Sequence, residues 1–271
     1  MKAEGGAGRP AKTSLKHILL LAPLICMASA GAANARPWVV TFGGGVNARP
    51  PYEGAKTYRI SPAPVFSVRP AKEYHRFNPP GDGSTIALIA TRYVSLGPIL
   101  RVRSSRGETG ALEGFKKIPW AAEPGGFIDL WPTDWLRARV EVRRGVNGHD
   151  GWVGDAGLDL VYSSRRFDFS IGPRVGFGDK NYNNTYFGVT PEDAARSPRI
   201  DTPYEPGEGR RYTGLKSAVA YHFDNHWRTT VSGGYQRLAD QMARSPVVLT
   251  AGKRDQYTAG VALTYSFQVG H

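Results

Sequence analysis

The chain has 271 residues, a formal net charge of +12 at pH 7 and one cysteine, Cys26. One cysteine cannot form a disulfide within the chain, so a disulfide-stapled fold is excluded. After residue 35 no stretch reaches the roughly 18 apolar residues of a membrane-spanning helix, so no such helix is predicted beyond that residue.

The N-terminus has the three parts of a secretory signal peptide. Residues Lys2–Lys16 carry most of its basic charge, an apolar run follows, and Ala33 and Ala35 form an A-x-A cleavage site. We therefore expect residues 1–35 to be removed and residues 36–271 to form one domain of an exported protein. A retained N-terminal anchor is the alternative interpretation.

Beyond that segment, apolar and polar residues alternate with the period of two that is typical of a β-strand. In residues 135–144 one face holds Leu136, Ala138, Val140 and Val142, and the other holds Arg137, Arg139, Glu141 and Arg143. Such segments are about ten residues long, as a tilted membrane strand requires. Their polar face is rich in Gly, Ser and Arg, which suits a confined lumen. The predicted fold is therefore all-β: a single closed antiparallel transmembrane β-barrel.

In chain order the pattern predicts about twelve strands, with ten as the alternative. They are roughly 37–47, 57–68, 73–78, 84–93, 96–106, 124–131, 135–145, 152–163, 166–178, 211–222, 226–237 and 255–267. An even number places both chain ends in the periplasm. Short periplasmic turns, several of them flanked by aromatic residues as in an interfacial girdle, then alternate with longer extracellular loops. The longest loop is 179–210.

The last predicted strand carries a candidate assembly signal. Tyr265 and Phe267 lie on the apolar face of this strand, and bacterial outer-membrane proteins end in such a strand with a terminal aromatic residue. The barrel assembly machinery is the expected reader of this signal. Four residues, 268–271, follow Phe267, which departs from the usual position of that aromatic at the chain end.

Motifs spread along the chain carry a resemblance to a known family. They are Pro51–Gly54, Gly148–Gly151, Tyr186–Ser197, Tyr204, the Tyr221…Trp227 hairpin, Tyr235…Leu238, Ser245–Val248 and Tyr265–Phe267. In these the chain resembles the MipA/OmpV family of outer-membrane proteins. The resemblance implies an outer-membrane barrel. It also implies a scaffold role, because one member is described as linking a murein-degrading transglycosylase to a murein synthase.

A short helix is predicted within the longest loop. Thr190 is a good N-cap, Pro191 suits the first helical position, and Glu192 lies in the first turn, with Arg196 following at the far end. One hypothesis is that Thr190, Pro191, Glu192 and Arg196 belong to a plug that closes the barrel mouth. The alternative is a helix that only orders a long loop.

The polar faces of the strands supply a set of candidate lumen-lining cations. They are Arg59, Arg101, Arg137, Arg139, Arg143, Arg174, Lys216 and Arg228. If a pore is open, these cations favour anions. A salt-bridged, closed interior is slightly preferred, because buried arginine requires carboxylate partners and a small barrel leaves little space.

No catalytic, metal or cofactor site is predicted. His149 and Asp150 are adjacent but lie in a Gly-bounded turn with no G-x-S-x-G motif, and the histidines lack zinc-ligand spacing. The Gly43–Gly45 run lacks the lysine and following helix of a phosphate loop, so glycines there are expected to give the first strand curvature or lumen space.

Three classes of function are left open, and the third, an outer-membrane enzyme, lacks a Ser/His/carboxylate set that converges on one wall of the predicted barrel. The first is a non-enzymatic structural or interaction protein, a scaffold for periplasmic murein synthase and hydrolase enzymes as the resemblance implies. The second is a narrow, anion-preferring channel for small solutes. Other expected contacts are outer-membrane lipid and the phosphates of lipopolysaccharide, whereas nucleic acid is the wrong partner for this compartment.

Overall fold

The computed structural model describes residues 37–71, 77, 79, 82–107 and 110–270. The predicted signal peptide, 1–35, and its cleavage site lie outside the described residues, as does nearly all of the predicted strand 73–78. Residues Arg36–His271 form one compact unit by themselves.

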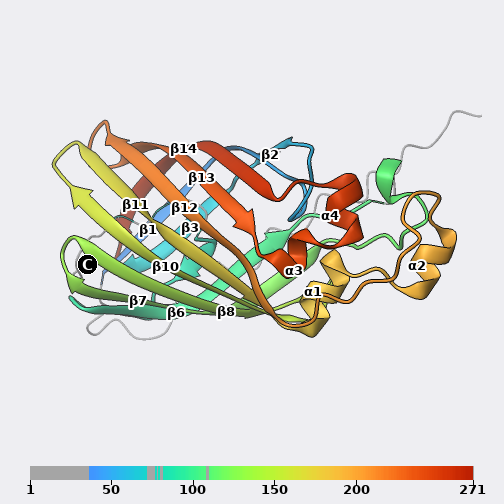
Figure 1. Ribbon diagram of the computed structural model, residues 1–271. Helices are drawn as coiled ribbons and strands as arrows, with labels where there is room; N and C mark the ends of the chain where they lie inside the picture. The colour runs from blue at the N-terminus through green and yellow to red at the C-terminus, as the bar shows by residue number, and fades with distance from the viewer. Residues whose placement is uncertain (1–36, 72–76, 78, 80–81, 108–109, 271) are drawn as a thin grey trace, which may run out of the picture. The chain divides into compact units, whose positions relative to one another are not determined.

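This unit is a closed β-barrel (Figure 1). Its strands are β1 Trp38–Arg49, β2 Arg59–Pro62, β3 Val65–Pro70, β4 Ser84–Ile86, β5 Ile89–Ala90, β6 Val94–Arg103, β7 Ala121–Thr133, β8 Leu136–Arg144, β9 Val146–Asn147, β10 Trp152–Ser163, β11 Phe167–Gly178, β12 Gly209–His222, β13 Trp227–Leu238 and β14 Asp255–Val269. Around the wall, β1 is followed by β14, β13, β12, β11, β10, β8, β7, β6, β4 and β3, and β3 returns to β1.

Eleven strands close the barrel, one fewer than the predicted twelve. The predicted strand 84–93 is not continuous, because the chain there forms only the two short strands β4 and β5. Neighbours around the barrel are antiparallel except β3 and β4, which run parallel through Ser67↔Thr85 and Val68↔Ile86. One parallel pair is what allows an odd number of strands to close while β1 and β14 stay antiparallel.

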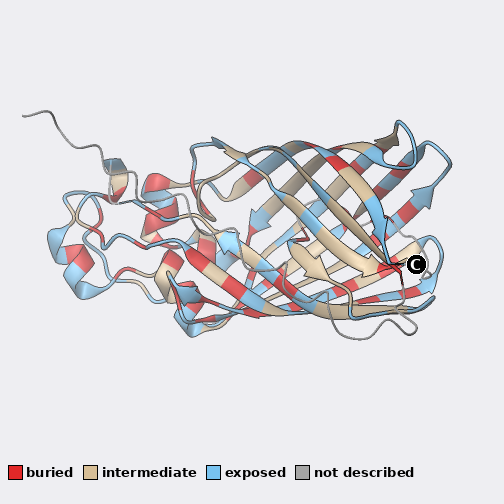
Figure 2. Ribbon diagram, turned by 180° about the vertical axis from the view of Figure 1, so that it is seen from behind, coloured by how far each residue is buried: buried red, intermediate tan, exposed pale blue. Residues whose placement is uncertain are grey.

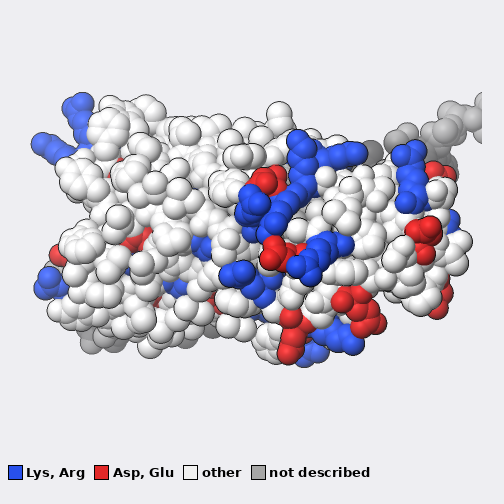
Figure 3. All heavy atoms as spheres, viewed as in Figure 1, with Lys and Arg blue, Asp and Glu red and all other residues white. Residues whose placement is uncertain are grey.

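The alternation of the strands is confirmed. Along β8 the side chains of Arg137, Arg139 and Arg143 are buried inside, whereas Val140 is 46% exposed and Val142 similarly so. Figure 2 shows the same change of burial from residue to residue along most strands. The barrel face in Figure 3 is nearly free of charged atoms between its two ends, as a lipid-facing belt requires.

The register of β8 gives the first testable prediction. Val140→Arg should destabilise the assembled barrel by roughly 2–4 kcal/mol if residue 140 lies near the bilayer midplane, because the guanidinium would face lipid. Urea titration in vesicles, followed by the gel-mobility difference between folded and unfolded barrel, measures this. Val140→Leu is the matched control, and equal stability of the two variants would show that residue 140 does not face lipid.

The two ends of the barrel differ. At one end, here called the turn end, short connections join β7 to β8, β10 to β11 and β12 to β13. β1 begins and β14 ends at this same end. Trp135, Tyr162 and Phe223 are exposed at these turns. Phe267 and Tyr265 of β14 pack with Phe42 of β1; whether they act as an assembly signal stays a prediction.

The opposite end, here called the loop end, carries all the α-helices. They are α1 Lys180–Phe187, α2 Pro191–Arg196, α3 Asp240–Ala243 and α4 Pro246–Ala251, and the 3-10 helix η1 spans Gly110–Leu112. None of the helices in the described part of the chain is long and apolar enough to cross a membrane. The predicted helix is confirmed as α2: Thr190 is its N-cap and accepts a hydrogen bond from the Asp193 amide.

Candidate functional site in the barrel lumen

At the turn end the lumen contains an apolar cluster. Phe77, which precedes β4, is buried there against Trp131 and Val161, together with Ala218 and Ala220. Trp131 and Val161 lie on the same strand faces as Asp129 and Asp159, which point into the lumen. The cluster therefore lies in the lumen. The guanidinium of Arg228 lies 5.8 Å from the centre of the Phe77 ring. This cluster therefore fills part of the lumen at the turn end.

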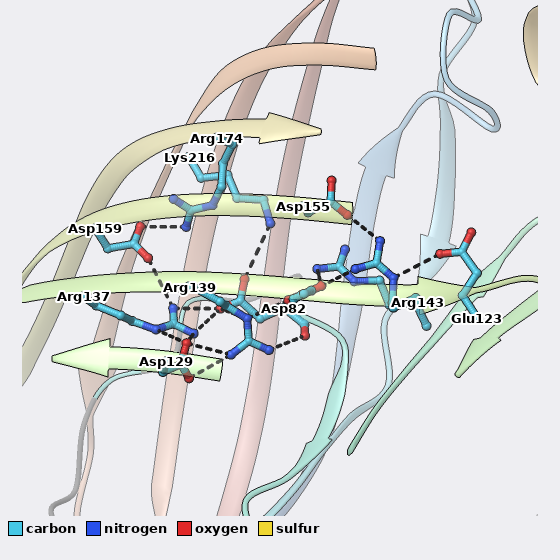
Figure 4. Close-up of polar contacts among 12 residues, drawn as sticks. Asp82, Glu123, Asp129, Arg137, Arg139, Arg143, Asp155, Asp159, Arg174 and Lys216 are labelled. Atoms are coloured by element: carbon cyan, nitrogen blue, oxygen red, sulfur yellow. Dashed lines mark hydrogen bonds and ion pairs between the residues drawn. The ribbon is translucent and has the colours of Figure 1, made fainter. Parts of the chain in front are cut away.

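The middle of the lumen is crossed by a network of ion pairs (Figure 4). Arg137 is 0% exposed and lies 2.9 Å from carboxylate oxygens of both Asp82 and Asp129. It also lies 3.2 Å from Asp159, which in turn is 2.6 Å from Arg174. The partners come from β7, β8, β10 and β11 and from the segment before β4, so the network joins different parts of the wall.

The network continues toward the loop end. Arg139 pairs with Asp129 at 2.9 Å and with Glu141 at 2.6 Å. Arg143 binds Glu141 and Asp155 and lies 3.3 Å from Glu123. Arg211 reaches Glu53 of the β1–β2 loop and lies 2.8 Å from Asp155. Because each charge here has opposite charges as neighbours, removal of one partner leaves an uncompensated buried charge.

Aromatic side chains cover the network at the loop end. Tyr182 and Tyr186 of α1 are fully buried, and their ring centres lie 5.1 and 5.4 Å from the Arg103 guanidinium. His149 packs edge-on against both rings and lies 3.1 Å from Glu123. Burial raises the pKa of Tyr186 to about 12, so its hydroxyl keeps its proton at neutral pH. α1 therefore covers the mouth.

The prediction that α2 plugs the barrel is wrong in its location. Ala194 of α2 packs with Leu112 of η1 and with Val247 and Ala251 of α4, which form a separate cluster. Figure 1 shows α2 beyond α1, at the far side from the strands. Thr190, Pro191, Glu192 and Arg196 thus lie above the mouth, because their amphipathic turn buries its apolar face against other loops.

Between the network and the opposite wall lies a cavity of about 250 Å³. One side is charged and includes Arg101, Arg103 and Lys216, whereas Arg49 follows Asn47 on β1 at the edge of the other side. The other side is built from small or neutral polar side chains of β1, β13 and β14: Asn47, Ser232, Gly233, Gln236, Gln256, Thr258 and Ala259. The lumen is therefore filled with charge on one side and partly empty on the other.

The predicted lumen cations divide into three groups. Arg101, Arg137, Arg139, Arg143, Arg174 and Lys216 face inward and take part in ion pairs with luminal carboxylates. Arg228 lies against Phe77. Arg59, by contrast, is exposed at the start of β2, because this strand begins at the rim, beyond the charged interior.

Sequence reasoning missed Arg103 and Arg211. Arg103 follows Arg101 by two residues on the same strand, so strict alternation was sufficient to find it. Arg211 is four residues before the outward-facing Leu215 on the same strand, so regular alternation places Arg211 on the outer face as well. A β-bulge pairs Tyr212 with Gly176 and Arg210 with Phe177, which leaves Arg211 between them and turns it inward.

His149 lies in the connection between β9 and β10. Its side chain is buried beside Glu123 and the α1 tyrosines. In the described part of the chain no three His, Cys, Asp or Glu side chains gather in a way that would hold a metal ion. His149 thus packs against α1 at the mouth.

The lumen and lipid belt agree with what comparisons with known proteins find. The family model described as MltA-interacting protein MipA matches residues 42–267. The outer membrane proteins Omp26La of Vibrio anguillarum and OmpV of Vibrio cholerae are each 29% identical over 93 residues, 34% of this chain and 34% of theirs. The matched part is thus about a third of these relatives.

Two solved outer-membrane barrels match the chain at low similarity. The COG4313 outer membrane channel from Pseudomonas putida F1 has a TM-score of 0.40 and 7% identity, covering 85% of this chain and 95% of that one. The NanC porin has a TM-score of 0.37 and 9% identity, covering 84% and 98%. With the family match over nearly the whole barrel, the chain belongs to the MltA-interacting protein MipA family and is an outer-membrane β-barrel.

Proposed function

We propose that this barrel is a non-enzymatic interaction protein of the MipA/OmpV type, whose lumen is closed and whose role is carried by its surfaces. The observation that carries the proposal is the fully buried Arg137, held by Asp82, Asp129 and Asp159 across the lumen. A network of buried ion pairs of this kind links the strands across the lumen and leaves no continuous path for solutes. Such a barrel is a rigid platform in the membrane.

The proposed partner is a periplasmic murein enzyme. Support comes from the family description, which names an interaction with MltA, and from the architecture. Short turns face the periplasm in outer-membrane barrels, so the turn end is the surface that such an enzyme meets. Arg165 and Arg166 are exposed in the β10–β11 turn, and they offer a basic contact there.

A binding measurement tests this proposal. The purified barrel in nanodiscs should bind the MltA-type transglycosylase of the same bacterium, and Arg165→Ala with Arg166→Ala should weaken that binding about tenfold, as loss of well-placed interface charges does. Biolayer interferometry gives the dissociation constants. The matched control is Lys180→Ala with Arg196→Ala, which removes two exposed charges at the loop end. Absence of binding, or equal weakening by the control pair, would contradict the proposal.

A narrow, anion-preferring channel is the second candidate. The cavity of about 250 Å³ with Arg49, Arg101 and Lys216 in its lining favours it, because cations lining a constriction select anions. The apolar cluster around Phe77 opposes it. Conductance measurements separate the two candidates.

A further inference from the structure

The luminal cavity is lined by more positive than negative charge. Its lining holds six cations, Arg49, Arg101, Arg103, Arg143, Arg211 and Lys216, and three carboxylates, Glu53, Glu123 and Asp155. The nearby carboxylate of Glu141 is 2.8 Å from Arg101 but is shared with Arg139 and Arg143. Among the described residues, the cavity side of the network is thus short of negative charge.

Arg49 shows this deficit most directly. It is the last residue of β1 and lines the cavity, yet it has no ion pair with a described carboxylate. Arg101 and Arg103 line the same cavity and act on Arg49 as like charges. A guanidinium facing other guanidinium groups over a cavity is stabilised when an anion enters between them.

The opposite wall can donate hydrogen bonds to such an anion. Ser232 and Gln236 of β13 and Thr258 and Gln256 of β14 line the same cavity. Hydroxyl and amide groups donate hydrogen bonds without adding charge. From these contacts we propose that the cavity is a binding site for a phosphate-type oxyanion, held by Arg49, Arg101 and Lys216 and completed by the polar wall.

The barrel wall beside this site is incomplete. β2 pairs only with β1, and β3 meets β4 through two residue pairs. β4 pairs with β6 only at Ile99 and Leu100, so residues 101–103 of β6 have a described strand partner only on the β7 side. A seam without main-chain pairing therefore separates β2 from the loop-end half of β6 within the described residues.

The cavity reaches this seam. Val102 points outward and is 62% exposed, yet it lines the cavity with Arg101 and Arg103. The outer surface beside the seam is apolar, with Ile60 of β2 75% exposed and Leu100 of β6 also exposed. A phosphate group therefore has two sources: a soluble anion entering the lumen, or the headgroup of a phosphorylated lipid whose chains leave through the seam.

Binding of inorganic phosphate tests the site itself. Titration calorimetry of the intact barrel in a zwitterionic detergent should show saturable binding, and Arg49→Gln should weaken it about tenfold or more, because a charge-assisted contact is lost. Arg237→Gln, at an exposed pair with Asp255, is the matched control and should leave the affinity unchanged. No saturable binding of either phosphate or phosphatidic acid, or equal affinity in Arg49→Gln and wild type, would overturn the proposal.

A second probe distinguishes the two sources. Short-chain phosphatidic acid and phosphatidylcholine are compared by native mass spectrometry. Entry through the seam predicts selective retention of phosphatidic acid, lost in Arg49→Gln and reduced by Val102→Trp, which fills the seam while phosphate binding persists. Entry of soluble anions predicts that Val102→Trp changes nothing and that phosphatidic acid gains no affinity over phosphate. Each of these two results supports the oxyanion site, and loss of phosphate binding in Val102→Trp with retention in Arg49→Gln contradicts it.

Discussion

Replacing Arg137 with alanine should lower the free energy of unfolding of the barrel by about 3–5 kcal/mol, the usual cost of removing one partner from a buried ionic cluster. Arg137 is fully buried, and its guanidinium contacts Asp82, Asp129 and Asp159. Without it, three carboxylates face one another with fewer cations between them. Urea titration of the folded protein in detergent micelles, followed by intrinsic fluorescence, measures the loss.

Two further variants show whether charge or packing causes this loss. Arg237→Ala removes an exposed arginine that pairs with Asp255, and it should change stability little because solvent screens that pair. Arg137→Ala with Asp129→Ala should recover part of the loss, since one of the stranded carboxylates is gone. Equal stability of Arg137→Ala and wild type would mean that the lumen hydrates its carboxylates and is not a closed network.

Replacing Asp82 with alanine should raise single-channel conductance several-fold and make the current anion-selective. Asp82 precedes β4 and lies inside the lumen, 2.9 Å from Arg137 and 3.8 Å from Lys216. Without this carboxylate, the cations of the wall lose the group that draws them together, and the net positive charge of the lumen rises. Planar-bilayer recordings with a salt gradient give both conductance and the sign of selectivity.

A loop deletion provides the contrast. Val189 and Tyr204 exchange two hydrogen bonds, so the two ends of the segment 190–203 already meet. Replacing that segment with two glycines should leave conductance low, because α2 lies outside the mouth and the Arg137 network is untouched. High conductance of the intact barrel would favour the channel over the interaction role. A large increase on loop replacement alone would show that the loop, and not the network, closes the barrel.

Much of the architecture follows from local sequence. The alternation in Leu136–Arg144 assigns one face to lipid and the other to the lumen, because successive side chains of a strand point to opposite sides whatever the rest of the chain does. The helix α2 also depends only on local sequence. The Thr190 side chain accepts a hydrogen bond from a first-turn amide, and Pro191 suits the first helical position. The membrane location and the positions of most strands were predictable because they depend on the alternation of apolar and polar residues within a short stretch of chain.

Which charges meet in the lumen was decided only by the tertiary structure. Asp82 and Glu53 lie in segments without strand alternation, so nothing in their local sequence shows that they meet Arg137 and Arg211. The bulge that turns Arg211 inward depends on the register of β12 against β11. These contacts join residues far apart in the chain, and they arise when the barrel closes. Closure fixes the register between neighbouring strands, the path of the segment before β4 and the position of the seam. Local periodicity determined which way each strand faces, and closure determined which charges meet.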